Sequence, residues 1–185
     1  MNKTNYTYRL TPGGEKAIYN AANKASTPKA LMLQPKFKLV GFDLDDTLIG
    51  GSTQPNVDTK LMATVLTVLK QNGVKTAVFS VNPRSTIYER LKVYGLLPLI
   101  DYPFFDGKGG KLRHLIERLG LAQKDVLFVG QDTYLDYLLM REHLKTLEII
   151  LLKDALTSGN IPQTDTHAAV VDRTLDVLLR RMFVM

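Results

Sequence analysis

The sequence predicts an α/β fold, a Rossmann-like doubly wound parallel sheet, from three observations. Short apolar segments alternate with amphipathic ones five times between residues 36 and 183. The apolar segments are continuous runs of Val, Leu, Ile and Phe, as expected for strands that are buried on both faces. Glycines follow several amphipathic segments, where helices commonly end. This alternation predicts a parallel sheet that is covered by helices on both faces.

Each apolar run has the length of a strand, and each amphipathic segment has the length of a helix. Asp58 and Asp172 stand just before two amphipathic segments, where side chains that cap helices are common. Pro83 opens another segment, since proline is tolerated in the first turn of a helix. The expected strands span residues 37–42, 74–81, 96–102, 126–129, 147–152 and 168–171. The expected helices span residues 57–69, 83–94, 109–119, 133–144 and 172–183.

The chain has 185 residues, which fits one domain with an added segment. Its net charge of +6 lies wholly in residues 1–38, which carry seven Lys and Arg side chains against the single acid Glu15. We therefore expect residues 1–35 to form a basic N-terminal arm with a short helix over residues 15–25, and residues 36–185 to form the folded domain. Such an arm suits contact with nucleic acid or an acidic partner, and it equally fits a solvated extension.

Several classes of protein are excluded by what the sequence lacks. Cysteine is absent, which excludes a disulfide framework, a thiolate metal site and a cysteine nucleophile. No run of about 18 apolar residues occurs, so no transmembrane helix is expected. Residues 1–9 lack the apolar core of a secretion signal. We therefore expect an intracellular protein, cytoplasmic or nuclear, without a membrane span.

Acidic side chains follow two of the expected strands. Asp43, Asp45 and Asp46 come directly after the first strand, and Asp132 and Asp136 follow the fourth. Open parallel sheets bind ligands outside the carboxyl ends of their strands, so these acids are expected to converge at one edge. Carboxylates that are held together favour a cation between them, and a set of oxygen ligands favours Mg²⁺.

Groups that suit a phosphate are expected at the same edge. Thr47 and Ser80 offer hydroxyl donors, and the backbone near Asn82 begins a helix whose positive end attracts anions. Lys108 or Lys111, at the start of another helix, would add a cation. Bound Mg²⁺ commonly completes its coordination with phosphate oxygens. The sequence therefore indicates a protein that binds a phosphorylated substrate.

Four segments resemble the motifs of the haloacid dehalogenase (HAD) superfamily, in that family's order. Residues 42–48, Phe-Asp-Leu-Asp-Asp-Thr-Leu, resemble the first motif, hhhDxDx[TV]. Residues 78–80, Val-Phe-Ser, are similar to the second motif, an apolar strand that ends in Ser or Thr. Lys108 fits the third motif, and residues 126–136 resemble the fourth, an apolar strand followed by Gly and two acids. The resemblance covers about residues 37–183.

This resemblance implies a Mg²⁺-dependent phosphatase that works through a phosphoaspartate intermediate. Asp43 would be the nucleophile, and Asp45 would be the general acid and base. The ion would be held by Asp43, the Asp45 carbonyl and Asp132, while Asp136 would support the lysine or a metal-bound water. The phosphate would be held by Thr47, Ser80, Asn82 and Lys108, or by Lys111 in place of Lys108.

One position departs from the family pattern. The fourth motif usually has Asp directly after Gly, whereas here Gln131 follows Gly130. We favour Asp132 as the metal ligand, because Asp132 and Asp136 keep the family's spacing of the two acids. Gln131 in the ligand position is the alternative, and it would weaken the site by one charge.

The sequence leaves no room for the substrate-selecting cap domains of the superfamily. Residues 48–56 form only a short flap, and residues 80–108 hold little more than one helix. The chain therefore resembles the uncapped magnesium-dependent phosphatase and protein-phosphatase branches, whose open sites suit a phosphoprotein or a nucleic-acid end. The alternatives are a nucleic-acid 3′-phosphatase served by the basic arm, a phosphotransferase, and a non-catalytic binding or structural protein that keeps the fold.

Overall fold

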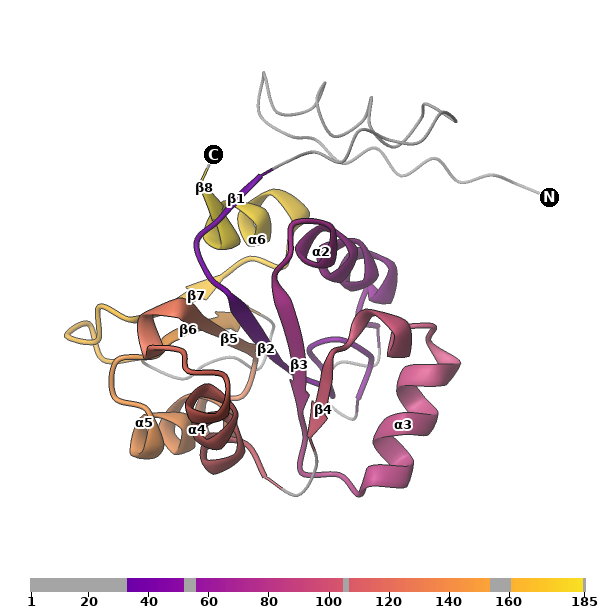
Figure 1. Ribbon diagram of the computed structural model, residues 1–185, viewed down its shortest axis with the longest axis horizontal. Coiled ribbons are helices and arrows are strands. Elements are labelled where there is room, and N and C mark those ends of the chain that lie inside the picture. Colours follow the sequence, from indigo (N-terminus) through magenta and orange to yellow (C-terminus); the bar gives the residue numbers. More distant parts are fainter. Residues whose placement is uncertain (1–32, 52–55, 105–106, 154–160, 185) are drawn as a thin grey trace.

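The computed structural model describes residues 33–51, 56–104, 107–153 and 161–184. Six parallel strands form its main sheet in the order β4-β3-β2-β5-β6-β7 (Figure 1). The predicted doubly wound parallel sheet is therefore confirmed. The strands are β2 (Leu39–Asp43), β3 (Lys75–Phe79), β4 (Tyr102–Phe104), β5 (Val126–Gly130), β6 (Glu148–Leu152) and β7 (Ala168–Val171).

Helices cover both faces of this sheet, as its apolar strands require (Figure 1). One face packs against α2 (Thr59–Gln71), α3 (Arg84–Val93) and α6 (Leu175–Met182). The other face packs against α4 (Gly109–Arg118), the π-helical segment η3 (Thr133–Leu138) and α5 (Leu139–His143). None of the helices in the described ranges is long and apolar enough to cross a bilayer.

Strand β2 lies inside the sheet, with β3 on one side and β5 on the other. All five of its residues are buried. The acids that follow β2 are therefore held at the carboxyl edge by a strand with neighbours on both sides. This placement fixes the positions of Asp43 and Asp45 more firmly than an edge strand would.

Two expectations about local structure are wrong. Residues 96–102 do not form a strand, because Pro98 cannot donate to a ladder and Leu97–Leu99 form a 3₁₀ turn, so that β4 begins only at Tyr102. Asp172 does not cap the last helix. That role belongs to Thr174, whose hydroxyl accepts a 3.4 Å hydrogen bond from the Val177 N–H. The cap predicted at Asp58 is confirmed, since its carboxylate accepts from the Leu61 N–H at 3.0 Å.

The segment before β2 is tied to the far end of the chain. Strand β1 (Gln34–Pro35) pairs with β8 (Phe183–Val184), which the sequence had placed at the end of a helix (Figure 1). The Leu33 N–H also donates to the side chain of Asn72 at 2.8 Å. Within the described residues, contacts with the body are thus made from residue 33 onward. Most of the expected basic arm, and its short helix over residues 15–25, lie outside the described residues.

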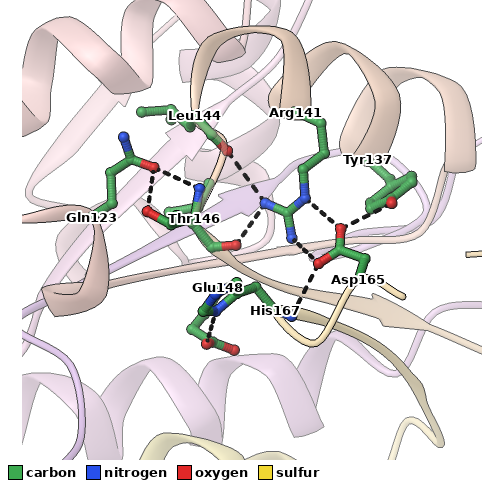
Figure 2. Close-up of polar contacts among 9 residues, drawn as sticks. Gln123, Tyr137, Arg141, Leu144, Thr146, Glu148, Asp165 and His167 are labelled. Carbon is green, nitrogen blue, oxygen red and sulfur yellow. Dashed lines mark hydrogen bonds and ion pairs between the residues drawn. The ribbon is translucent and has the colours of Figure 1, made fainter. Parts of the chain in front are cut away.

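A partly buried ion pair fastens the loop that leads into β7 (Figure 2). The Arg141 guanidinium donates to both oxygens of Asp165, at 2.6 and 3.2 Å, and also to the backbone carbonyls of Leu144 and Leu147. Asp165 accepts further hydrogen bonds from the Tyr137 hydroxyl at 2.9 Å and from the backbone N–H of the residue two positions later at 3.0 Å. We call these groups the Arg141 network.

Candidate active site

Three charged side chains meet at the carboxyl edge of the sheet. The ammonium group of Lys108 lies 2.8 Å from one oxygen of Asp43 and 2.5 Å from one oxygen of Asp136. These side chains come from the end of β2, the start of α4 and the segment η3. All three are buried, and Asp136 is wholly inaccessible to solvent. The structure therefore gathers three predicted site residues into one cluster, in which Lys108 takes the central place and Lys111 stays exposed.

A glycine allows Asp136 to reach this cluster. One oxygen of Asp136 accepts the backbone N–H groups of Gln131 and Asp132, at 2.9 and 3.0 Å, while the other accepts from Lys108. A Cβ atom on Gly130 would lie only 2.5 Å from the Cβ of Asp136, which is closer than real side chains approach. The glycine that ends β5 is thus needed for the approach of Asp136, and no positive φ angle is involved.

The cluster holds two carboxylates and one ammonium group in a buried space. Burial, followed by repulsion from Asp136, raises the pKa of Asp43 to about 8, against the opposing pull of Lys108. Burial alone would lower the pKa of Lys108, but its two carboxylate neighbours outweigh burial and raise that pKa. The lysine thus stays charged, and the cluster has room for one more positive charge.

Asp45 belongs to a second group of contacts at the same edge. One of its oxygens pairs with the guanidinium of Arg90, and the other accepts from the Asn82 side chain at 2.5 Å. The backbone N–H of Asn82 in turn donates to the hydroxyl of Ser80 at 3.1 Å. The predicted residues Asp45, Ser80 and Asn82 are therefore linked. Arg90 was not predicted, because an arginine inside a helix carries no motif of its own.

The loop after β2 is shaped by backbone contacts. Asp46 adopts a positive φ of 58°, and its carboxylate accepts from the Gly51 N–H at 2.8 Å. Arg173, which follows β7, donates to the carbonyls of Asp46 and Thr47 at 2.5 and 2.7 Å. Arg173 is a second residue at this edge that sequence reasoning missed, because only the folded chain brings it to a loop 126 positions away.

Thr47 is fully buried, and its hydroxyl finds no hydrogen-bond partner in the described part of the chain. A buried hydroxyl without a partner costs about 1–3 kcal/mol. An oxygen of a bound ligand would satisfy such an atom, which belongs to the loop after β2. This observation agrees with the expectation that Thr47 holds a phosphate.

Asp132 has a structural task that the sequence did not reveal. One of its oxygens caps η3 by accepting the Leu135 N–H at 2.6 Å, and its other oxygen has no partner among the described residues. At the end of η3, the Leu139 N–H donates to the carbonyl of Tyr134, five residues back. This π-turn accommodates an extra residue in the helix, which offers a physical reason why Gln131 can be tolerated before Asp132.

A cavity of about 320 Å³ opens beside Lys108. Its walls include the apolar side chains of Val81, Leu135 and Leu139, with Lys111 and His143 among its polar groups. A cavity of this size admits a small organic molecule. A larger groove of about 430 Å³ lies at the opposite edge of the sheet, where the strands begin and where none of the predicted site residues is found.

The donors at the carboxyl edge fit Mg²⁺. No cluster of three or more acidic or histidine side chains arranged to hold a metal ion occurs within the described ranges. Mg²⁺ needs fewer, because it usually takes one or two carboxylates and completes its shell with water and phosphate oxygens. Burial, followed by repulsion from Asp136, raises the pKa of Asp43, and a bound divalent cation would favour its charged form.

The fold is shared with solved phosphatases. A predicted phosphoglycolate phosphatase from Haemophilus somnus superposes with a TM-score of 0.56 at 17% identity, covering 80% of this chain and 99% of that one. The 3-deoxy-D-manno-octulosonate 8-phosphate phosphatase from Moraxella catarrhalis, solved with magnesium, phosphate and its sugar acid, gives a TM-score of 0.53 at 19% identity over 80% of this chain and 88% of that one.

The N-terminal part of a Bacteroides fragilis protein, which contains a phosphatase domain with bound Mg, gives a TM-score of 0.52 at 20% identity. That match covers 62% of this chain and spans only 36% of the other. No protein-family model matches the sequence, and comparison with curated proteins gave no match. The likeness in structure therefore defines the fold, which this chain shares with these solved phosphatases.

Proposed function

We propose that this protein is a Mg²⁺-dependent phosphomonoesterase of the HAD type. The observation that carries the proposal is the buried Asp43–Lys108–Asp136 cluster at the carboxyl end of an interior strand, with Asp45 two residues away. The three solved proteins compared above are described as phosphatases or as containing a phosphatase domain, and two of them were solved with magnesium.

The proposed reaction has two steps on Asp43. A carboxylate oxygen of Asp43 attacks phosphorus, the bond to the ester oxygen breaks, and Asp45 gives that oxygen a proton. The substrate alcohol leaves, and the phosphoryl group remains on Asp43. Asp45 then takes a proton from water as the water attacks phosphorus and the bond from phosphorus to Asp43 breaks, which releases inorganic phosphate and restores the Asp43 carboxylate and the protonated Asp45.

The remaining residues hold the phosphate and its charge. Lys108 neutralises the oxygens of the phosphoryl group, and Ser80, Asn82 and Thr47 donate hydrogen bonds to them. Asp136 holds Lys108 in position through their 2.5 Å contact. Mg²⁺, when bound, neutralises charge between Asp43 and the phosphate.

We propose that the ion is held by Asp43, the Asp45 carbonyl and the free oxygen of Asp132. A carboxylate at this place offsets the ion's charge, whereas the amide of Gln131 would supply only a dipole. Asp132→Ser keeps an oxygen to cap η3 but removes the carboxylate. We therefore expect Asp132→Ser to raise the Mg²⁺ concentration needed for half activity far more than Gln131→Ala. The reverse ranking would assign the ligand position to Gln131.

The test of the function is hydrolysis of p-nitrophenyl phosphate with Mg²⁺ and with EDTA. Turnover that requires both Mg²⁺ and Asp43 supports the proposal, and no turnover in a screen of sugar phosphates, nucleotides, phosphopeptides and DNA ends would overturn it. The lack of a cap domain also admits the phosphoprotein or nucleic-acid end expected from the sequence. Salt-dependent retention of the full chain on single-stranded DNA tests whether residues 1–38 bind nucleic acid.

A further inference from the structure

Arg90 occupies a place at the site that the proposed chemistry does not use. Its guanidinium pairs with one oxygen of Asp45 and donates to the Gly50 carbonyl at 2.8 Å. Both side chains of the Arg90–Asp45 pair are 29% exposed, so the pair borders solvent at the mouth of the site. We infer that Arg90 is a binding subsite for a carboxylate on the leaving group of the substrate. This inference rests on the proposed function.

The position of Asp45 defines where the leaving group must lie. In the proposed reaction, the ester oxygen of the substrate approaches Asp45. The atoms attached to that oxygen therefore come within reach of the Arg90 guanidinium, which lies beside Asp45. The two oxygens of Asp45 are occupied by Arg90 and by Asn82, which donates at 2.5 Å. Protonation of the leaving oxygen therefore requires Asp45 to release one of these donors.

A substrate carboxylate would make this release favourable. In the structure Arg90 binds the carboxylate of Asp45. A carboxylate of the substrate has the same shape and charge, so it can take the place of Asp45 on Arg90. The planar guanidinium binds carboxylates with two parallel hydrogen bonds, which lysine cannot do. A substrate without an anion would leave the half-buried Arg90 without a counter-ion once Asp45 turns away, which selects against it.

The helix that carries Arg90 is firmly placed. Ile87 and Leu91, which flank Arg90 on α3, are fully buried in the core. The contact with Gly50 would also hold the guanidinium after Asp45 has moved. A fixed cation close to the ester oxygen favours a small phosphorylated acid over the larger substrates that an open site also admits.

The test compares two substrates that differ by one group. Phosphoglycolate and ethyl phosphate share the ester oxygen and one methylene, but the first carries a carboxylate where the second has a methyl group. We expect kcat/KM for phosphoglycolate to exceed that for ethyl phosphate by at least about tenfold. Arg90→Met should remove this preference by lowering kcat/KM for phosphoglycolate at least about tenfold more than kcat/KM for ethyl phosphate, and Arg90→Lys should keep part of the preference. The control Arg113→Met removes an exposed arginine of α4 and should change kcat/KM for neither substrate.

Binding gives a second measurement that does not depend on turnover. With Asp43→Asn as background, phosphoglycolate should bind at least about tenfold more weakly when Arg90→Met is added, as measured by calorimetry. Equal losses for both substrates would show that Arg90 only positions Asp45, and would overturn the inference. Faster turnover of a 3′-phosphorylated dinucleotide than of phosphoglycolate would also overturn it. Absence of all turnover, of p-nitrophenyl phosphate included, would instead overturn the proposed function.

Discussion

The cluster of Lys108 with Asp43 and Asp136 and the Arg141 network are both charged and shielded from solvent, the first buried and the second partly buried, but they differ in the balance of their charges. Lys108 lies between two carboxylates, Asp43 and Asp136, and the hydroxyl of Thr47, in the loop after β2, has no partner among the described residues. Arg141 faces a single carboxylate, Asp165, and its remaining donors reach backbone carbonyls (Figure 2). The Lys108 cluster therefore has more acidic than basic groups, and the loop after β2 has an unsatisfied hydroxyl. In the Arg141 network the two charges are matched and the donors of Arg141 have acceptors.

The pKa shifts of the two carboxylates reflect this difference. Burial and the nearby Asp136 raise the pKa of Asp43 to about 8. Burial would also raise the pKa of Asp165, but hydrogen bonds from Arg141 and Tyr137 outweigh burial and lower that pKa. The Arg141 network, in which the charges are matched, stabilises the fold. The Lys108 cluster, which has two carboxylates for one ammonium group, can bind a metal cation together with an anionic substrate. The comparison therefore separates a structural ion pair from a site for chemistry.

The largest expected effect is on activity. Asp43→Asn removes the proposed nucleophile, so turnover of p-nitrophenyl phosphate should fall by at least about 1,000-fold. The fold should remain intact, because the change removes charge from a crowded cluster. Circular dichroism and thermal unfolding check the fold. Near wild-type turnover in this variant would refute the covalent mechanism.

The two regions should also respond to pH in opposite directions. The pKa of Asp43 is raised, so between about pH 4 and pH 8 the folded protein keeps a proton that the unfolded chain has lost. Stability from this group is complete below about pH 4 and declines as the pH rises toward 8. The pKa of Asp165 is lowered, so its contribution is present at neutral pH and declines in acid.

Denaturant unfolding in EDTA between pH 5 and pH 8 measures this dependence. In Asp43→Asn the decline with rising pH should be smaller than in the wild type, because the substituted side chain does not titrate. Identical slopes in the two proteins would mean that the Asp43 carboxyl is already ionised in the folded state at pH 5.

Breaking the balanced network should cost stability and leave the chemistry intact. Arg141→Ala leaves the partly buried Asp165 carboxylate without its guanidinium partner, so the free energy of unfolding should fall by about 1–3 kcal/mol. Activity per folded molecule should stay near the wild-type value at low temperature. Arg113→Ala, which breaks an exposed pair with Glu117, is the matched control and should cost less than about 0.5 kcal/mol. A similar loss of unfolding free energy in Arg141→Ala and Arg113→Ala would show that the Arg141 network contributes no more to stability than an exposed ion pair.

A smaller effect is expected from crowding the site without changing its charge. Gly130→Ala places a methyl group against Asp136, so either β5 or η3 must move. Overpacking of this kind costs about 1–3 kcal/mol, and the shift of Asp136 should loosen Lys108 and reduce kcat. Gly120→Ala is a useful comparison, because a Cβ there meets no atom within 4 Å and only its positive φ of 63° resists the change. It should cost stability without lowering kcat.

The smallest expected effect concerns the unpaired hydroxyl. Thr47→Val removes a buried donor that has no partner in the described part of the chain, so stability without ligand should rise by about 1 kcal/mol. If Thr47 holds the phosphate, affinity for inorganic phosphate in the presence of Mg²⁺ should fall in the same variant. Thermal unfolding with and without phosphate measures both changes, and a variant that is less stable would show that the hydroxyl has a partner.

The sequence by itself determined the sheet and much of the candidate site. The strand periodicity located β2, β3, β5, β6 and β7, because buried parallel strands are continuous apolar runs. Since parallel strands end at a common edge, it also predicted that Asp43 and Asp136 would lie close together, with Lys108 or Lys111 at the same edge. The strand expected over residues 96–102 does not form, because Pro98 cannot donate a hydrogen bond to the ladder. The sequence pattern of residues 133–144 predicted a helix but did not indicate its π-turn.

Only the tertiary structure decided which groups touch. It chose Lys108 over Lys111, because Nζ of Lys108 is the one that lies between the two carboxylates. It also brought Arg90 to Asp45 and Arg173 to the loop after β2, across 45 and 126 residues. Side chains that meet over such distances share no spacing in the sequence. Their contacts follow from how helices and loops pack around the sheet, which local patterns do not record.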